Sequence, residues 1–310
     1  MKKWRMGVLW TILLVAFGRT ASPPKVEWKH DPGRELTLLA DGQTLWTFHF
    51  AAKDNWPYFH PLSLPGGPVL TGLSPKDHPW HRALWFSWKF INGLNYWEFK
   101  DLKDPASEPA GRTELTGEED VKTASDGATI AMDIAYRHNG VIVMKEKRVI
   151  RAGLPRADGS YIIDWQGTFM ALDRDVELNK DTGYAGLFFR GSPKLSQPRY
   201  LNSEGAGEMA VHQKAAKWID LTGVVNPDFG PAGVTIFDHP GNPRFPTPWW
   251  RDRSRNDDEI SYIGSAPLFS GPYVIQAGRS MLLRYRVLVH KGAPNAEALN
   301  REFESFKSLR

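Results

Sequence analysis

ATIAMDIAYRHNGVIVMKEKRVIR, residues 128–151, contains the pattern that decides the fold class. Two runs that alternate apolar and polar residues flank Asn139-Gly140, a dipeptide typical of a two-residue hairpin turn. The same pattern recurs in LTLLADGQTLWTFHF, residues 36–50, where Asp41-Gly42 separates two apolar runs. Both stretches predict antiparallel β-hairpins.

Further strand patterns follow along the chain, at residues 161–172, 184–190, 233–237 and 273–290. Only residues 295–309 have apolar side chains at helical spacing, with Leu299, Phe303 and Phe306 on one side. Consecutive hairpins favour an antiparallel architecture over parallel βαβ units. We therefore predict an all-β fold, a large antiparallel β-sandwich with one C-terminal helix packed on its outside.

The N-terminal segment predicts export. Three basic residues among the first five precede an uncharged apolar run at residues 6–17, and small residues follow, as in a secretory signal peptide. The run is shorter than the roughly 20 residues that a membrane span needs. We expect residues 1–21 to be a cleaved signal peptide and residues 22–310 to form a single β-sandwich domain. The mature protein would be periplasmic or secreted and have no integral membrane segment; an uncleaved N-terminal anchor is the alternative.

Charge and cysteine content exclude several classes of function. The chain has 39 basic and 35 acidic residues, but four of the basic ones lie before Ser22, which leaves 35 of each sign in the expected mature chain. This balance argues against a nucleic-acid partner and against a polybasic membrane patch. The sequence has no cysteine, which excludes disulfides, thiolate metal ligands and a cysteine nucleophile.

Two histidine motifs indicate where the protein acts. Residues 77–88, DHPWHRALWFSW, combine imidazoles, indoles, a guanidinium and a carboxylate, and residues 57–62, PYFHPL, add His60. Prolines after His60 and His78 favour turns and extended backbone, in which His78 and His81 can converge. We predict an acid–base site, or a metal site with a divalent ion as cofactor, formed by His60, His78 and His81. The alternative is that individual histidines bind backbone carbonyls.

Neighbouring side chains predict a carbohydrate ligand. Trp80 and Trp85 can stack on a sugar ring, although most aromatics in such a stretch belong to the core. Arg82 and Arg190 can hold hydroxyl groups or a carboxylate, or else tie down backbone carbonyls.

A second Asp-His-Pro sequence, residues 238–240, ends the strand pattern at residues 233–237. We predict that Asp238 and His239 supply a second acid–base pair across a cleft from the first motifs. The structural alternative is an Asx-type turn that closes the strand.

These motifs resemble those of exported bacterial proteins labelled PmoA-like. The resemblance covers most of the mature chain and rests on PYFHPL, DHPWHRALWF, Asn92-Gly93 with Tyr96-Trp97, FDHPGNP at 237–243 and LRYRVLVH at 283–290. Ala83 stands where the family commonly has glycine. The label comes from a methane monooxygenase subunit, an integral membrane protein, whereas this chain has no apolar span after its signal.

The resemblance implies a galactose-mutarotase-like supersandwich. In that fold, histidine and carboxylate side chains on a concave sheet face act on C1 of a sugar or on uronic or keto sugars. We therefore expect an exported carbohydrate-active enzyme that is a hydrolase, lyase or epimerase, with His-based acid–base or metal-assisted chemistry. A non-catalytic periplasmic glycan-binding protein is the alternative. The sequence has no phosphate loop, GxSxG elbow or dinucleotide fingerprint.

Overall fold

The computed structural model describes residues 24–76, 78–99, 109–179, 185–251 and 261–308. The predicted signal peptide at residues 1–21 and Asp77 of the histidine motif lie outside these ranges. Within the described residues, no helix combines the length and apolar character that crossing a membrane requires.

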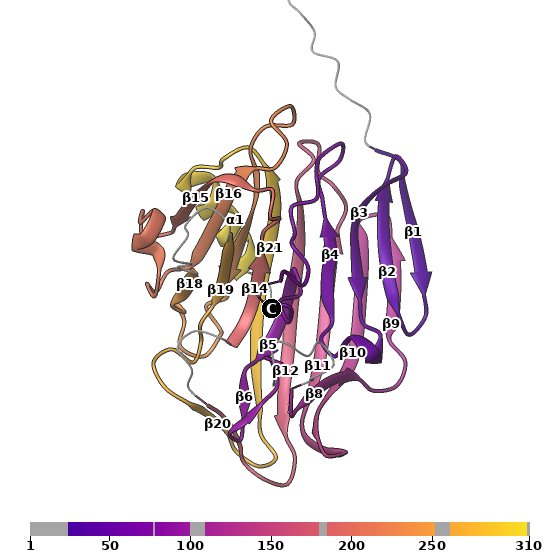
Figure 1. The fold of residues 1–310 in the computed structure, drawn as a ribbon, viewed down its shortest axis with the longest axis vertical. Coiled ribbons are helices and arrows are strands. Elements are labelled where there is room, and N and C mark those ends of the chain that lie inside the picture. Colours follow the sequence, from indigo (N-terminus) through magenta and orange to yellow (C-terminus); the bar gives the residue numbers. More distant parts are fainter. Residues whose placement is uncertain (1–23, 77, 100–108, 180–184, 252–260, 309–310) are drawn as a thin grey trace, which may run out of the picture.

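The first large sheet of the described residues contains eight strands. Its order is β1 (Val26–Asp31), β2 (Glu35–Ala40), β3 (Gln43–His49), β4 (Tyr58–Leu62), β5 (Leu84–Trp88), β14 (Ala185–Arg190), β19 (Tyr262–Ser265) and β18 (Trp249–Arg251). In Figure 1 this sheet runs from β1 on the right to β18 on the left.

The second large sheet contains nine of the described strands. Its order is β15 (Ser196–Asn202), β16 (Trp218–Val224), β17 (Ala232–Asp238), β21 (Ser280–Lys291), β12 (Tyr161–Ala171), β11 (Val141–Gly153), β10 (Gly127–His138) and β8 (Arg112–Leu115), with β9 (Asp120–Ala124) paired to β10. A small sheet joins β20 (Tyr273–Ile275), β13 (Val176–Leu178), β6 (Phe90–Ile91) and β7 (Leu94–Asn95). The helical elements are η1 (Ala52–Asp54), η2 (Glu208–Val211) and α1 (Ala296–Lys307).

The strand pairs are antiparallel, and both predicted hairpins are present. Asn139 and Gly140 connect β10 to β11 with φ angles of 48° and 78°, and Asp41 and Gly42 connect β2 to β3 with φ angles of 49° and 79°. Positive φ at both central residues is the mark of a type I′ turn, whose twist matches that of the strands. The predicted all-β antiparallel architecture is confirmed.

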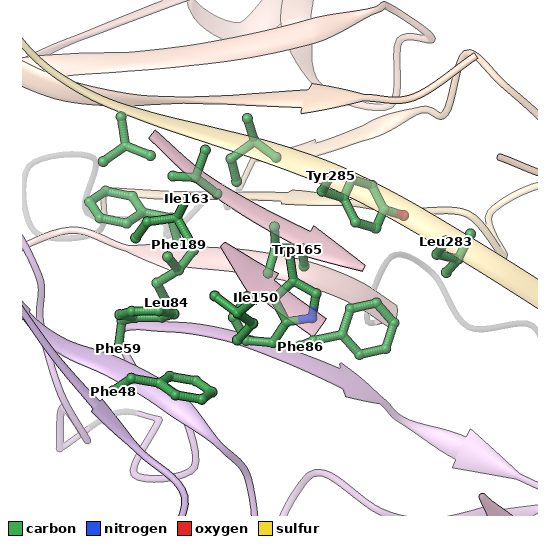
Figure 2. Close-up of a cluster of buried hydrophobic side chains, with 14 of the residues drawn as sticks. Phe48, Phe59, Leu84, Phe86, Ile150, Ile163, Trp165, Phe189, Leu283 and Tyr285 are labelled. Atoms are coloured by element: carbon green, nitrogen blue, oxygen red, sulfur yellow. The ribbon is translucent and has the colours of Figure 1, made fainter. Parts of the chain in front are cut away.

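The main core lies between the two large sheets. Figure 2 shows Phe48, Phe59 and Phe86 from the eight-stranded sheet facing Trp165 and Tyr285 from the nine-stranded sheet. Side chains alternate between the two sides of a strand, so residues between these positions point away from the core.

Helix α1 covers the other side of the nine-stranded sheet, as the sequence predicts. Asn295 caps it by accepting a hydrogen bond from the Ala298 backbone. Its apolar side, with Leu299, Phe303 and Phe306, packs on Trp218, Phe237 and Leu288 of that sheet.

The outer side of the eight-stranded sheet carries a second buried cluster. On β5 and β14, Leu84, Phe86, Leu187 and Phe189 face the main core, whereas the alternate residue Trp85 faces outward with Phe188. The full cluster comprises Trp56, Tyr58, Trp80, Trp85, Trp97, Phe188 and Tyr262. Because aromatic rings fill this face, the polar side chains among them are held in a low-dielectric environment.

Candidate functional site

The two histidine motifs meet on the outer face of the eight-stranded sheet. β4 pairs with β5 at Phe59 and Leu84, and β14 pairs with β19 at Arg190 and Tyr262. His60 follows Phe59 and Ala83 precedes Leu84, and we call His60, Ala83, Arg190 and Tyr262 the row of this face. The backbone N–H of Arg190 donates to the Ala83 carbonyl at 2.6 Å, which fixes the centre of the row. Ala83 has a φ of 64°, a left-handed backbone conformation that favours glycine.

The chain before β5 folds back so that His81 lies against this row. The backbone N–H of His81 donates to the His78 carbonyl at 2.9 Å, which closes a turn around Pro79. The His81 ring, which is 0% exposed, stacks on Tyr262 with centroids 4.9 Å apart and on His78 at 4.7 Å. The convergence of His78 and His81 in a turn, which their spacing predicts, is present.

Arg190 determines the tautomer of His81. Its Nη1 lies 3.5 Å from Nδ1 of His81, and a guanidinium can only donate, so Nδ1 is the acceptor and Nε2 carries the proton. Burial lowers the pKa of His81 well below its usual value, and the neighbouring His78 and Arg190 lower it further. His81 is therefore neutral at pH 7. Its Nε2–H has no hydrogen-bond partner among the described residues.

His60 is the second neutral imidazole of the site. Its Nδ1 lies 2.8 Å from Oγ1 of Thr71, which also accepts the Leu62 backbone N–H at 3.1 Å. Burial, and then the charge on His49, lowers the pKa of His60. Unlike His81, His60 is only partly buried, so a ligand can reach it from the outer face.

The guanidinium group of Arg82 lies over two rings of the aromatic cluster. The guanidinium lies 5.4 Å from the ring centroid of Trp56 and 5.8 Å from that of Tyr58, and Nη1 donates to Ser74 at 3.2 Å. Cation–π contacts of this kind stabilise a guanidinium that has lost part of its hydration. Arg82 and Arg190 thus bring two positive charges to the site.

The structure does not support a stacking role for Trp80 and Trp85. Trp80 is 7% exposed and Trp85 is 1% exposed, and both belong to the outer aromatic cluster. A sugar ring needs an open indole face, and neither residue offers one. The alternative interpretation, that these indoles are core residues, is the one that fits.

The prediction for Asp238 and His239 is wrong. The pair ends β17, in the nine-stranded sheet, and its two side chains diverge because consecutive strand residues point to opposite sides. His239 contacts Phe306 of α1, with ring centroids 5.1 Å apart. Asp238 accepts hydrogen bonds from Asn242 at 2.7 Å and from the Thr247 backbone at 2.8 Å. Asp238 closes the following loop through these longer-range bonds instead of the Asx-type turn of the structural alternative, and burial raises its pKa to about 7.

The predicted metal site of His60, His78 and His81 is also not formed. In the described part of the chain, no three histidine, aspartate or glutamate side chains are grouped so that they could hold a metal ion. His60 is engaged with Thr71, and the rings of His78 and His81 stack on each other instead of directing their nitrogens to a common point.

Sequence analysis missed three residues of this face. Tyr262 stacks on His81, Thr71 contacts His60, and His49 contacts the His60 carbonyl at 2.8 Å. His49 lies within a predicted strand, but it belongs to neither of the histidine motifs. Thr71 and Tyr262 reach the site only through strand pairing between distant parts of the chain.

The fold and the outer face together define a class: antiparallel β-sandwich proteins with a site of histidine, arginine and aromatic residues on one sheet. The chain belongs to a family of unknown function, DUF6807, whose model matches residues 35–304. The PmoA-like label stays a resemblance of motifs. A comparison with curated proteins found no significant match.

Several solved structures resemble the chain distantly. Two are each described as a "putative aldose 1-epimerase". The one from Klebsiella pneumoniae has a TM-score of 0.41 and 10% sequence identity, and the match covers 95% of this chain and 86% of that protein. The one from Escherichia coli K12 has a TM-score of 0.38 and 12% sequence identity, and the match covers 86% of this chain and 99% of that protein. The Slr1438 protein from Synechocystis sp. PCC 6803 has a TM-score of 0.38 and 13% identity over 92% of this chain and 100% of its own.

Proposed function

We propose that this protein is an exported carbohydrate-active enzyme that binds a sugar or glycoside on the outer face of the eight-stranded sheet. It would act as a hydrolase, lyase or epimerase through histidine chemistry. One observation carries the proposal: His60 follows Phe59, which pairs with Leu84, while Arg190 bonds the neighbouring Ala83 and lies with its Nη1 3.5 Å from Nδ1 of His81. Two neutral imidazoles beside guanidinium groups suit a ligand rich in hydroxyl groups, with or without a carboxylate.

His60 is the proposed proton acceptor. A general base must be unprotonated at the working pH and accessible to the ligand. The lowered pKa of His60 meets the first condition, and its partial exposure meets the second. His78, half-buried and stacked on His81, is the proposed partner in proton exchange.

His81 has a different proposed role. Its Nδ1 faces Arg190 and its low pKa prevents protonation near neutrality, so His81 is poorly suited to exchange protons. Because its ring is 0% exposed, His81 is instead proposed to hold the Arg190 guanidinium in place beneath the surface of the site. Arg82 and Arg190 would hold hydroxyl groups or a carboxylate of the same ligand.

The test is a substrate screen on protein purified without a histidine tag. Reducing sugars are followed by anomer exchange in NMR, and glycosides and uronides by product release. On an active substrate, His60→Ala and His78→Ala should lower turnover by about 10²–10⁴-fold, the usual contribution of a positioned histidine. His138→Ala is the control, because this ring lies on β10 of the nine-stranded sheet, with its Nδ1 3.1 Å from the Ala110 carbonyl. Full turnover in His60→Ala and His78→Ala would contradict the assignment.

A second candidate is a glycan-binding protein without catalysis. The environment of His81 favours it, because a buried imidazole held in one tautomer by Arg190 is poorly suited to proton transfer. This candidate predicts saturable glycan binding with no product, and binding that survives His60→Ala.

A further inference from the structure

His49 of β3 connects three strands beside the proposed site. Its Nε2 lies 2.8 Å from the carbonyl oxygen of His60 on β4. Its Nδ1 lies 3.0 Å from the carboxylate of Glu35 on β2. The His49 ring also stacks on Tyr58, with centroids 4.8 Å apart and planes inclined by 25°. Because β2, β3 and β4 are neighbours in the sheet, this imidazole links β2 to β4, the strand that carries His60.

Both nitrogens of His49 face acceptors. A carbonyl oxygen can only accept, so Nε2 carries a proton. An ionised carboxylate also only accepts, so the contact of Nδ1 with Glu35 is most favourable when Nδ1 is protonated as well. Stacking on Tyr58 adds cation–π attraction for a charged ring. The surroundings of His49 therefore favour its imidazolium form.

We propose that Glu35 and His49 are positioning residues for His60. The Glu35 carboxylate orients His49, whose Nε2–H holds the His60 carbonyl and whose positive charge lies near the His60 ring. Thr71 holds the other side of His60 through Nδ1. The inference rests on the role that the proposed function gives to His60.

The consequence is that His60 stays unprotonated and fixed in place. A positive charge nearby disfavours a second one, so charged His49 makes protonation of His60 less favourable. Burial of His60 acts in the same direction, and the two effects together lower its pKa. Because its pKa is lowered, His60 stays unprotonated, and so able to accept a proton, at lower pH than an exposed histidine.

The remaining charged and titratable groups around the pair come from several elements. Asp31 of β1 lies opposite Glu35, and Asp54 of η1 and Arg82 both act on Tyr58. Asp54 offsets part of the positive charge of Arg82, whereas Asp31 pairs with Arg34. Among the described side chains, Glu35 is the carboxylate in contact with His49.

The experiment follows the ring nitrogens of the histidines by NMR as a function of pH, on the full chain. In wild type, Nε2 of His49 should carry the proton that bonds the His60 carbonyl. His49→Gln, which keeps a donor for the His60 carbonyl but removes the charge, should raise the pKa of His60 by roughly half a pH unit, the effect of one charge a few ångströms away in a partly solvated site. Glu35→Gln should raise it in the same direction by a smaller amount, because His49 then holds its second proton less well.

A matched control exists elsewhere in the chain. Glu119 pairs with His30 at 2.9 Å, so Glu119→Gln removes an equivalent carboxylate and should leave the His60 titration unchanged. The proposal is overturned if Nε2 of His49 carries no proton in wild type, or if the folded His49→Gln protein titrates at His60 like wild type. If either variant fails to fold, the other variant and the wild-type protonation state decide.

The titration separates this inference from the proposed function, because it needs no substrate. An unshifted His60 would contradict the positioning role and leave the sugar site in place. A shifted His60 in a protein that neither binds nor turns over any sugar would contradict the proposed function alone.

Discussion

The Nη1 atom of Arg190 lies 3.5 Å from Nδ1 of His81, and both side chains are buried. This contact joins β14 to the loop before β5 and places a fixed positive group beside an imidazole. The tautomer and the proposed role of His81 follow from it, whereas burial is the main cause of its lowered pKa.

The first prediction ranks the causes of the lowered pKa of His81. Burial is the largest cause, and the charges of His78 and Arg190 are smaller ones. Arg190→Gln should therefore raise the pKa of His81 only in part and leave it below the ordinary value. NMR titration of the His81 ring measures this. Complete restoration of the ordinary pKa would show that the Arg190 charge, not burial, dominates.

The second prediction concerns pH and stability. The pKa of Asp238 is about 7 in the folded protein, against 3.8 for an unperturbed aspartate. Between about pH 4 and pH 7 the folded chain keeps a proton that the unfolded chain loses, so this group makes the free energy of unfolding fall as pH rises through that window. Since one pKa unit corresponds to about 1.4 kcal/mol, the loss approaches roughly 4 kcal/mol above pH 7.

Urea unfolding at several pH values tests this prediction. Asp238→Asn should lack this pH-dependent loss, so its stability relative to wild type should improve as pH rises from 4 to 7. Asp133→Asn, at an exposed position of β10, is the control and should keep the wild-type slope. Parallel curves for wild type and Asp238→Asn would contradict the assignment.

The third prediction tests the outer aromatic cluster. A Cβ on Gly264 of β19 would lie 1.9 Å from the Phe188 ring, and a packed ring cannot move aside cheaply. Gly264→Ala should lower the free energy of unfolding by about 1–3 kcal/mol, the usual cost of overpacking. Gly153→Ala, whose Cβ would have no neighbour closer than 3.5 Å, should change it by less than about 0.5 kcal/mol. Equal costs for the two variants would contradict the packing described for this face.

The fourth prediction concerns an ion pair inside the main core. Arg148 donates two hydrogen bonds to Glu146, at 2.7 and 2.8 Å, and Tyr136 donates a third at 2.7 Å. Both charged side chains are 0% exposed. Arg148→Met should cost about 3–5 kcal/mol because it leaves a buried carboxylate without its counter-charge. Adding Glu146→Leu should recover much of that loss in chemical denaturation, whereas a double variant that loses the sum of the single costs would contradict a coupled pair.

The sequence predicted the parts of this structure that local rules determine. Asn139-Gly140 and Asp41-Gly42 predicted their hairpins because a two-residue turn depends on the conformations of its own residues. The convergence of His78 and His81 was predictable for the same reason. The two residues are three positions apart, and Pro79 between them favours a turn.

Relationships that depend on strand order could not be predicted. β5 and β14 are neighbours in the sheet although about a hundred residues separate them, and this pairing brings Arg190 to His81. The repeated Asp-His-Pro at 238–240 was misleading for the same reason, because similar motifs can end strands in different sheets. Trp80 and Trp85 show the remaining difficulty: composition reveals aromatic side chains, but only packing distinguishes a buried indole from an open one.

The most direct test of the central claim is a map of where a sugar binds. Isotope-labelled protein is titrated with the sugar that the screen identifies, and backbone amide shifts are followed residue by residue. The account predicts concentration-dependent shifts at Ala83, Arg190 and Tyr262 on the outer face of the eight-stranded sheet, and none at His239. Shifts confined to the nine-stranded sheet, or no shift with any sugar tested, would contradict it.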